Sequence, residues 1–140
     1  MDAKELLSHY HTYKQRAEMF KEEYEEEIEL IDSIRSSANI DGLPRQKFIN
    51  RDTESRAIRL TEKLERMQNA IIEAVEIRQK VFDIVSEIPD VYGIVLSKRY
   101  IQEKQWCDIA EEMNFSEEYL RGSLHKKALK MMQDALDSRS

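Results

Sequence analysis

Apolar residues recur at steps of three or four along the first quarter of the chain. They are Leu6, Tyr10, Tyr13, Ala17, Phe20, Tyr24, Ile28, Ile31 and Ile34. Alternating steps of three and four place side chains on one side of a helix, as in coiled coils. The spacing therefore predicts one long helix from Asp2 to about Arg35. The acidic run EEYEEE, where the spacing slips near Glu27, falls mostly on the opposite face and is interpreted as a solvated surface.

A second series of apolar residues has the same spacing. It comprises Ala57, Leu60, Leu64, Met67, Ile71, Ala74, Val81, Ile84 or Val85, and Ile88. Pro89 is expected to end this helix, because proline cannot donate the helical hydrogen bond and restricts the residue before it. Between the two series, residues 36–51 contain Gly42 and Pro44 and predict a loop. Asp52 or Thr53 is the expected cap of the second helix.

Two helices that each have a single apolar side are not stable alone in water. We therefore expect residues 1–88 to form a long antiparallel helical hairpin of coiled-coil type, or to pair with the same helices of a second copy. The sequence leaves these two arrangements open, so a homodimer is one of the expected states.

The composition favours an all-α fold. Only 3 glycines and 2 prolines are present, and 36% of the residues are charged. The formal charge of −6 argues against a general polyanion binder. However, residues 91–140 hold eight basic and eight acidic residues, so the whole net charge of −6 lies in residues 1–90. The C-terminal part is therefore the part that can approach phosphates.

Several classes of protein find no support in the sequence. Cys107 is the only cysteine, which excludes an intrachain disulfide and a cysteine metal cluster. His9 and His11 lie too far apart around a helix to share a metal ion. There is no catalytic triad, phosphate loop or carboxylate pair, so we expect no enzyme, cofactor or metal. With neither a signal peptide nor a long apolar run, we expect a cytoplasmic protein that does not enter the membrane.

Residues 89–140 predict a compact unit of three helices. The first covers VYGIVLSKRYI, the second Trp106–Met113, and the third begins behind Ser116 and extends to about Leu136. Asn114 suits a left-handed turn between the last two helices, and Ser116 suits an N-cap. Small Ala110 allows the helices to approach, and Trp106 is expected to fill the core rather than to stack on a base. Apolar anchors complete the pattern: Ile109, Met113, Phe115, Leu120 and Leu124.

The segment LSKRYIQEKQWCDIAEEMNFSEEYLRGSLHKKALKMM resembles the helix-turn-helix of region 4 in sigma factors. It is also similar to phage and prophage regulators related to the ArpU and RinA late-gene activators. The resemblance covers residues 88–136 and implies control of transcription, through promoter DNA or through RNA polymerase. Family members often have Gly and Ser or Thr before the motif, where this chain has Glu103 and Gln105.

If the last helix enters the major groove of DNA, its side away from Leu120 and Leu124 makes the contacts. Arg121 is the expected base reader, because its planar fork matches guanine. Lysines near it would hold phosphates, and Gly122 would permit close approach of the backbone. The predicted DNA-binding residues are Lys104, Gln105, Ser116, Glu118, Tyr119, Arg121, Gly122, His125, Lys126 and Lys127.

The beginning of this helix also favours a second hypothesis. Glu117 and Glu118 suit the positive end of a helix dipole but repel phosphates. The alternative function is an adaptor that does not bind DNA and whose helical domains bind a protein such as RNA polymerase. The two hypotheses differ in salt dependence, because binding through several phosphate contacts weakens steeply as salt rises.

Overall fold

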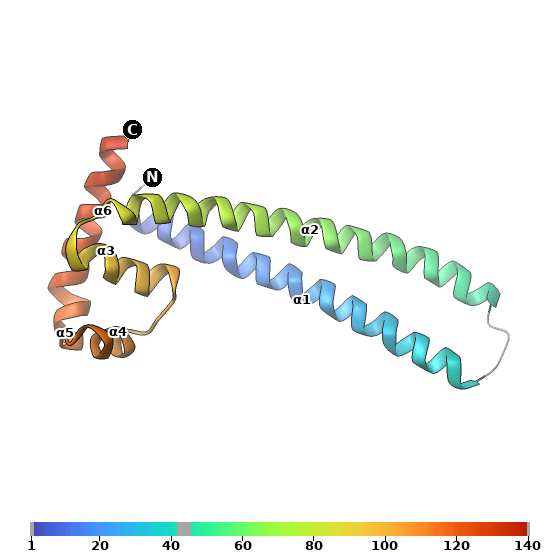
Figure 1. Cartoon of the computed structure of the whole chain (residues 1–140). Coiled ribbons are helices and arrows are strands. Elements are labelled where there is room, and N and C mark those ends of the chain that lie inside the picture. The colour runs from blue at the N-terminus through green and yellow to red at the C-terminus, as the bar shows by residue number, and fades with distance from the viewer. Residues whose placement is uncertain (1, 42–45, 140) are drawn as a thin grey trace. The chain divides into compact units, whose positions relative to one another are not determined.

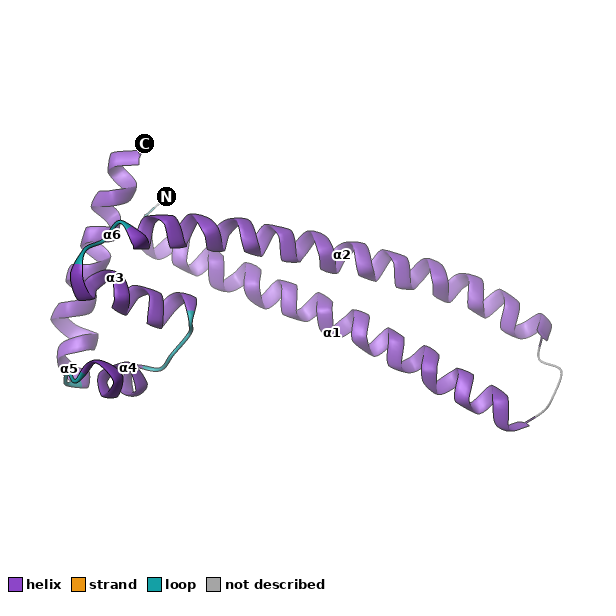
Figure 2. Ribbon diagram, viewed as in Figure 1, coloured by secondary structure: helices purple, strands orange, loops and turns teal. Residues whose placement is uncertain are grey.

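The computed structural model describes residues 2–41 and 46–139, and the side chains of residues 2–34 and 54–139. The described residues form helices joined by short turns and contain no strand, which confirms the all-α prediction (Figures 1 and 2). Two segments, labelled η, are π-helical turns. In chain order the elements are α1 Ala3–Asp41, α2 Gln46–Ser86, α3 Asp90–Leu96, η1 Ser97–Ile101, α4 Trp106–Met113, α5 Glu117–Tyr119, η2 Leu120–Leu124 and α6 His125–Arg139.

The first two helices extend farther than the sequence pattern predicted. α1 continues to Asp41 and α2 begins at Gln46, so residues 36–41 and 46–51 of the expected loop are helical. The expected caps Asp52 and Thr53 therefore lie inside α2. Adding a residue to an existing helix costs much less than starting one, so a helix continues past its last apolar residue until a breaker stops it. Gly42 and Pro44 lie outside the described residues.

The chain divides into two compact units. Unit 1 consists of residues 1–12 and 75–140, and unit 2 of residues 13–74. This division differs from the predicted boundary between residues 88 and 89, because both ends of the expected hairpin contribute to the core of unit 1. Leu6, Leu7 and Tyr10 of α1 are buried in one cluster with residues of α2, α3, η1 and α6. The cluster also contains Val81, Ile84, Val85, Ile88, Leu96, Ile101, Ala128 and Met132.

A second buried cluster of unit 1 lies among α3, α4 and the segment α5–η2. Its centre is formed by Val95, Ile109, Leu120 and Leu124, none more than 1% exposed. The cluster positions α5 and η2 against α4. The cluster thus supports the surface formed by the turn between α4 and α5 and by the helix that follows it.

The corner between α2 and α3 depends on a glycine. α2 ends at Ser86, three residues before Pro89, and Pro89 is the N-cap of α3. A Cβ on Gly93 would lie 2.5 Å from the carbonyl oxygen of Ile88 and 2.9 Å from that of Val85. Since both neighbours are backbone atoms, only glycine lets α3 pack this closely against the end of α2.

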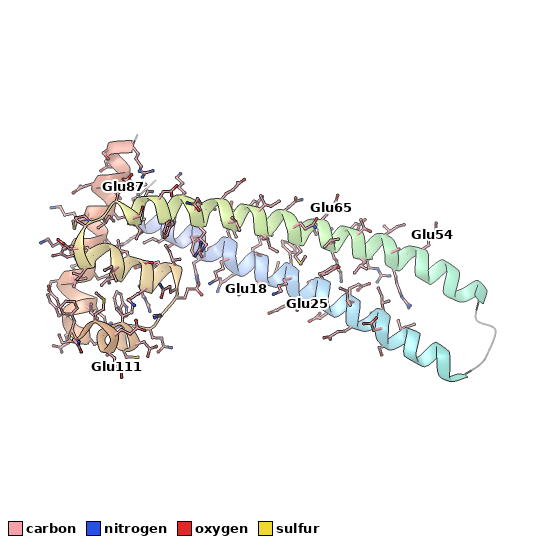
Figure 3. The ribbon with its side chains drawn as sticks, viewed as in Figure 1. Glu18, Glu25, Glu54, Glu65, Glu87 and Glu111 are labelled. Carbon is pink, nitrogen blue, oxygen red and sulfur yellow. The ribbon has the colours of Figure 1, made fainter. Side chains whose placement is uncertain are left out.

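In unit 2, residues of α1 and α2 run side by side in opposite directions (Figure 2). The Lys63 Nζ lies 3.2 Å from Glu27 and 3.3 Å from Glu23. Glu25, labelled in Figure 3, is exposed and fits the solvated surface predicted for the run EEYEEE. Glu27 does not, because it is only 5% exposed. The slip in the apolar spacing turns this carboxylate toward α2.

Candidate nucleic-acid interface

The turn between α4 and α5 is formed by a residue in left-handed conformation. Asn114 has φ 58° and ψ 38°, and its backbone N–H donates to the carbonyl oxygen of Ala110. The N–H of Phe115 donates to the same oxygen at 3.1 Å. Asparagine tolerates this conformation better than other non-glycine residues. The prediction of a left-handed turn at Asn114 is confirmed.

Ser116 begins the next helix as predicted. Its backbone is extended, with φ −72° and ψ 146°, and its Oγ accepts a hydrogen bond from the Tyr119 N–H at 3.2 Å. A serine cap of this kind satisfies one of the free N–H groups at a helix start. The Ser116 side chain is therefore engaged in capping, although the residue is exposed.

Gln105 is the N-cap of α4, but its side chain makes no capping hydrogen bond. Its carbonyl oxygen accepts from the N–H groups of Asp108 and Ile109, each at 3.1 Å. The amide is exposed at the start of α4, and its oxygen accepts a weak hydrogen bond from the Cys107 thiol at 3.9 Å.

The aromatic residue after this cap packs inside unit 1. The Arg99 guanidinium carbon lies 4.9 Å from the centroid of the Trp106 ring, on which the His125 ring packs edge-on at 4.9 Å. Trp106 also packs against the cluster that contains Val95 and Ile109. The prediction that Trp106 fills the core is confirmed, although the indole remains partly exposed.

The helix after Ser116 is not one regular α-helix. Three residues of α5 lead into the π-helical turn η2, and α6 follows without a break. A π-helical turn holds more residues than an α-helical turn. The positions after η2 are therefore rotated relative to those of a straight α-helix. The predicted DNA-binding face assumes such a straight helix.

His125 is the first residue after this turn. Its Nε2 lies 2.6 Å from the Tyr100 hydroxyl, and its ring stacks on the Tyr100 ring at 5.8 Å. Burial lowers the pKa of His125, and the charges of Arg99 and Lys4 lower it further. Burial also raises the pKa of Tyr100. The prediction that His125 shares the exposed face with Arg121 is wrong, because the imidazole faces Tyr100 and Trp106.

Lys104 is bound to a carboxylate. Its Nζ lies 2.6 Å from Glu112, whose other oxygen lies 2.7 Å from the Nζ of Lys98. The hydrogen bonds from the two lysines, first from Lys104 and then from Lys98, hold the pKa of Glu112 below its usual value. Lys104 must exchange this partner before it binds a phosphate. The sequence pattern missed this trio, since its members are separated by 8 and 14 residues and no helical spacing connects them.

The other predicted cations are more accessible. Arg121 lies 3.4 Å from Glu117, and both side chains are well exposed. The Lys127 Nζ lies 5.1 Å from the centroid of the Tyr92 ring, and a hydrogen bond with Tyr92 raises the pKa of this lysine. Lys126 is exposed.

Glycine and two exposed side chains complete this surface. Around Gly122, no atom lies within 4 Å of the position that a Cβ would take. Tyr119 is 44% exposed and packs edge-on against Phe115 at 5.5 Å. Glu118 is exposed as well. We call Glu118, Tyr119, Arg121, Gly122 and Lys126 the α5–α6 face.

No protein-family model matches the chain, and the comparisons with curated proteins and with solved structures give no significant match. The resemblance to ArpU- and RinA-related regulators therefore stays a prediction. Within the described ranges, no three His, Cys, Asp or Glu residues form a group that could hold a metal ion. None of the helices described is long and apolar enough to cross a membrane.

Proposed function

We propose that the chain is a transcription regulator of phage type that binds promoter DNA through a C-terminal helix-turn-helix. The observation that carries the proposal is the connection between α4 and α5. A left-handed Asn114 is followed at once by the capping Ser116, above a core formed by Ile109 and Leu120. This geometry supports a fixed angle between two short helices, which a helix needs if it is to enter the major groove as a rigid unit.

On this proposal, the α5–α6 face meets the DNA. Arg121 reads a base, since the carboxylate of its partner Glu117 is exposed and 3.4 Å away. Exposed ion pairs of this kind contribute little free energy and are readily exchanged for a phosphate or a base edge. Lys126 holds a phosphate. Gly122 leaves the backbone open to close approach because no side chain covers it.

The two long helices would serve dimerisation or contact with a partner, as an antiparallel hairpin. Support comes from large apolar side chains of unit 2 that remain exposed. Ile58 is 58% exposed and Ile72 is 55% exposed, and they lie two heptads apart on α2. Residues at heptad spacing share one side of a helix, which is the arrangement that helix pairing requires.

One observation favours the adaptor hypothesis instead. Lys98 and Lys104 share Glu112, and the helix that would enter the groove begins with Glu117 and Glu118. These carboxylates reduce the positive potential that draws a protein to DNA. An adaptor that binds RNA polymerase or another protein would not need that potential.

The experiment that tests the proposal is selection of bound fragments from a sheared library of the source genome at about 0.1 M salt. The wild-type chain is compared with the double variant Arg121→Ala/Lys126→Ala. A matched control, Arg78→Ala/Lys80→Ala, removes the same charge from exposed positions of α2. Circular dichroism establishes that all three proteins are folded.

We expect one site to be enriched by wild type and by the control, but not by the α5–α6 variant. The enrichment should fall steeply as salt is raised, because phosphate contacts release counterions. Equal loss in both variants would indicate a general charge effect and contradict the assignment of the face. No enrichment by wild type would reject DNA binding and favour the adaptor.

A further inference from the structure

Unit 1 has a groove that the proposed DNA contacts do not use. Its volume is about 670 Å³, within the usual range for sites that bind small molecules. One wall is the beginning of α1, with Lys4, Leu7 and Ser8, and the other is the π-helical turn η1, with Arg99 and Tyr100. Both walls belong to the same compact unit.

One end of the groove is cationic. Lys4 and Arg99 both line the groove beside Tyr100, whose hydroxyl is hydrogen-bonded to His125, and their charges lower the pKa of His125. Neither cation has a carboxylate partner among the described side chains. The Arg99 Nη1 donates to the Lys104 carbonyl oxygen at 3.1 Å, and Trp106 lies beneath its guanidinium. These contacts fix the guanidinium while most of its five N–H donors stay available.

The other end of the groove has a different character. His11 lies there with its Nδ1 3.4 Å from the carboxylate of Glu103. His11 follows Lys4 by seven residues, so the two ends lie about 10 Å apart along α1. A carboxylate accepts hydrogen bonds from hydroxyl groups. Between the two ends, Leu7 and the ring of Tyr100 supply apolar surface.

We propose that this groove binds a small organic phosphate of the size of a nucleoside monophosphate. Its phosphate lies between Lys4 and Arg99, and its hydroxyl-bearing part points toward Glu103. A planar guanidinium and an ammonium together match the charge and the acceptor oxygens of a phosphate. The proposal does not depend on DNA binding, since it uses no residue of the α5–α6 face.

A ligand in the groove would be coupled to the α5–α6 face through side-chain contacts. Tyr100 lines the groove and contacts His125, which directly follows η2. The groups that face His125 are Tyr100 and Arg99 of η1, Trp106 of α4 and Lys4 of α1. A bound phosphate would offset the charges of Lys4 and Arg99. The pKa of His125 should therefore rise when the ligand binds.

The test is an NMR titration of the isotope-labelled full chain with adenosine 5′-monophosphate, adenosine and inorganic phosphate. We expect saturable shifts for the monophosphate at residues that line the groove, and binding weaker by about tenfold for each of the other two probes. Lys4→Ala should weaken monophosphate binding by about tenfold, and Lys4→Arg should restore it. Lys80→Ala, an exposed lysine of the same unit outside the groove, is the control and should bind like wild type.

The histidine ring gives a second readout. The pKa of the His125 imidazole should be higher with the monophosphate than without it. The absence of saturable shifts up to about 10 mM, where even weak ligands bind, would overturn the proposal. Equal affinity for adenosine would show that the phosphate is not recognised, and equal affinity for inorganic phosphate would show that the organic part is not. Both results would also overturn it.

Discussion

The two units of this chain bury very different residues. In unit 1, large apolar side chains from five or more elements are wholly inside, among them Ile84, Leu96, Ile109, Leu120 and Met132. In unit 2, the buried side chains within residues 13–34 and 54–74 are Ala17, Glu27 and Ala70. Unit 1 is thus stabilised by a packed core, whereas unit 2 is stabilised by partly buried side chains along one pair of helices. The difference shows that similar apolar spacing does not ensure similar burial.

The largest expected effect compares a leucine from each unit. Leu120→Ala should lower the free energy of unfolding by about 3–5 kcal/mol, because the side chain is fully buried and leaves a cavity. Leu64→Ala in unit 2 should cost about 1 kcal/mol, because Leu64 is only partly buried. Urea denaturation followed by circular dichroism measures both. Equal losses would contradict the contrast between the two units.

Two glycines of unit 1 should respond in opposite directions. Gly93→Ala should cost about 1–3 kcal/mol, because its Cβ would meet two backbone carbonyl oxygens that cannot move aside. Gly122→Ala should stabilise unit 1 by up to about 1 kcal/mol, because alanine favours helix and meets no neighbour. Thermal denaturation separates the two variants. On the proposed function, Gly122→Ala should also weaken DNA binding despite its higher stability, which a purely structural glycine would not do.

The buried carboxylate of unit 2 offers a smaller test. The Oε1 of Glu27 is buried without a hydrogen-bond partner, while its Oε2 is paired with Lys63. Removing a carboxylate from water is costly, and an apolar residue of similar size often does as well or better. Glu27→Leu should therefore raise the melting temperature of unit 2 by a few degrees. The exposed Glu25→Leu is the control and should change it little; a lower melting temperature for Glu27→Leu would show that the ion pair stabilises unit 2.

The smallest expected effect is a pH dependence confined to unit 1. The folded state lowers the pKa of His125 below its unfolded value of about 6.5, so unfolding takes up a proton in this range. The histidine therefore does not affect stability well above pH 6.5. Stability falls as the pH drops through the unfolded pKa, and the loss levels off below the folded pKa.

His125→Gln should remove this pH dependence. It is measured as the difference between the free energies of unfolding of the variant and of wild type at roughly pH 5–8. His9→Gln serves as the control, because His9 lies on the exposed side of α1. A profile of His125→Gln parallel to that of wild type would contradict the folded environment assigned to this ring.

The local features of the fold were predictable from the sequence. The helices follow from apolar spacing and the scarcity of breakers, and the turn follows from the residues Asn114 and Ser116. Both residues act through their own backbone and the nearest turn, so their neighbours in sequence are sufficient to identify them. The helix ends near residues 41 and 46 were less predictable, because a helix extends past its apolar pattern.

The residues of the candidate site were predicted only in part. Arg121 and Lys126 are exposed as expected, and Gly122 is partly exposed. The position of His125 depends on its contacts with Tyr100 and Trp106, and the partner of Lys104 depends on how α4 packs near η1. Neither has a sequence signal, because each contact depends on packing rather than on the spacing of one helix.

The sequence by itself determined that this protein is helical and that a left-handed turn joins α4 to α5. Backbone conformation and capping are short-range properties, fixed by a few adjacent residues. Only the tertiary structure decided that the first turns of α1 complete the core of unit 1, that Glu27 is buried, and that Lys4 and Arg99 line one groove. Each of these features depends on contacts between residues that are tens of positions apart in the sequence. The free energy that brings such residues together is gained only when the whole core packs.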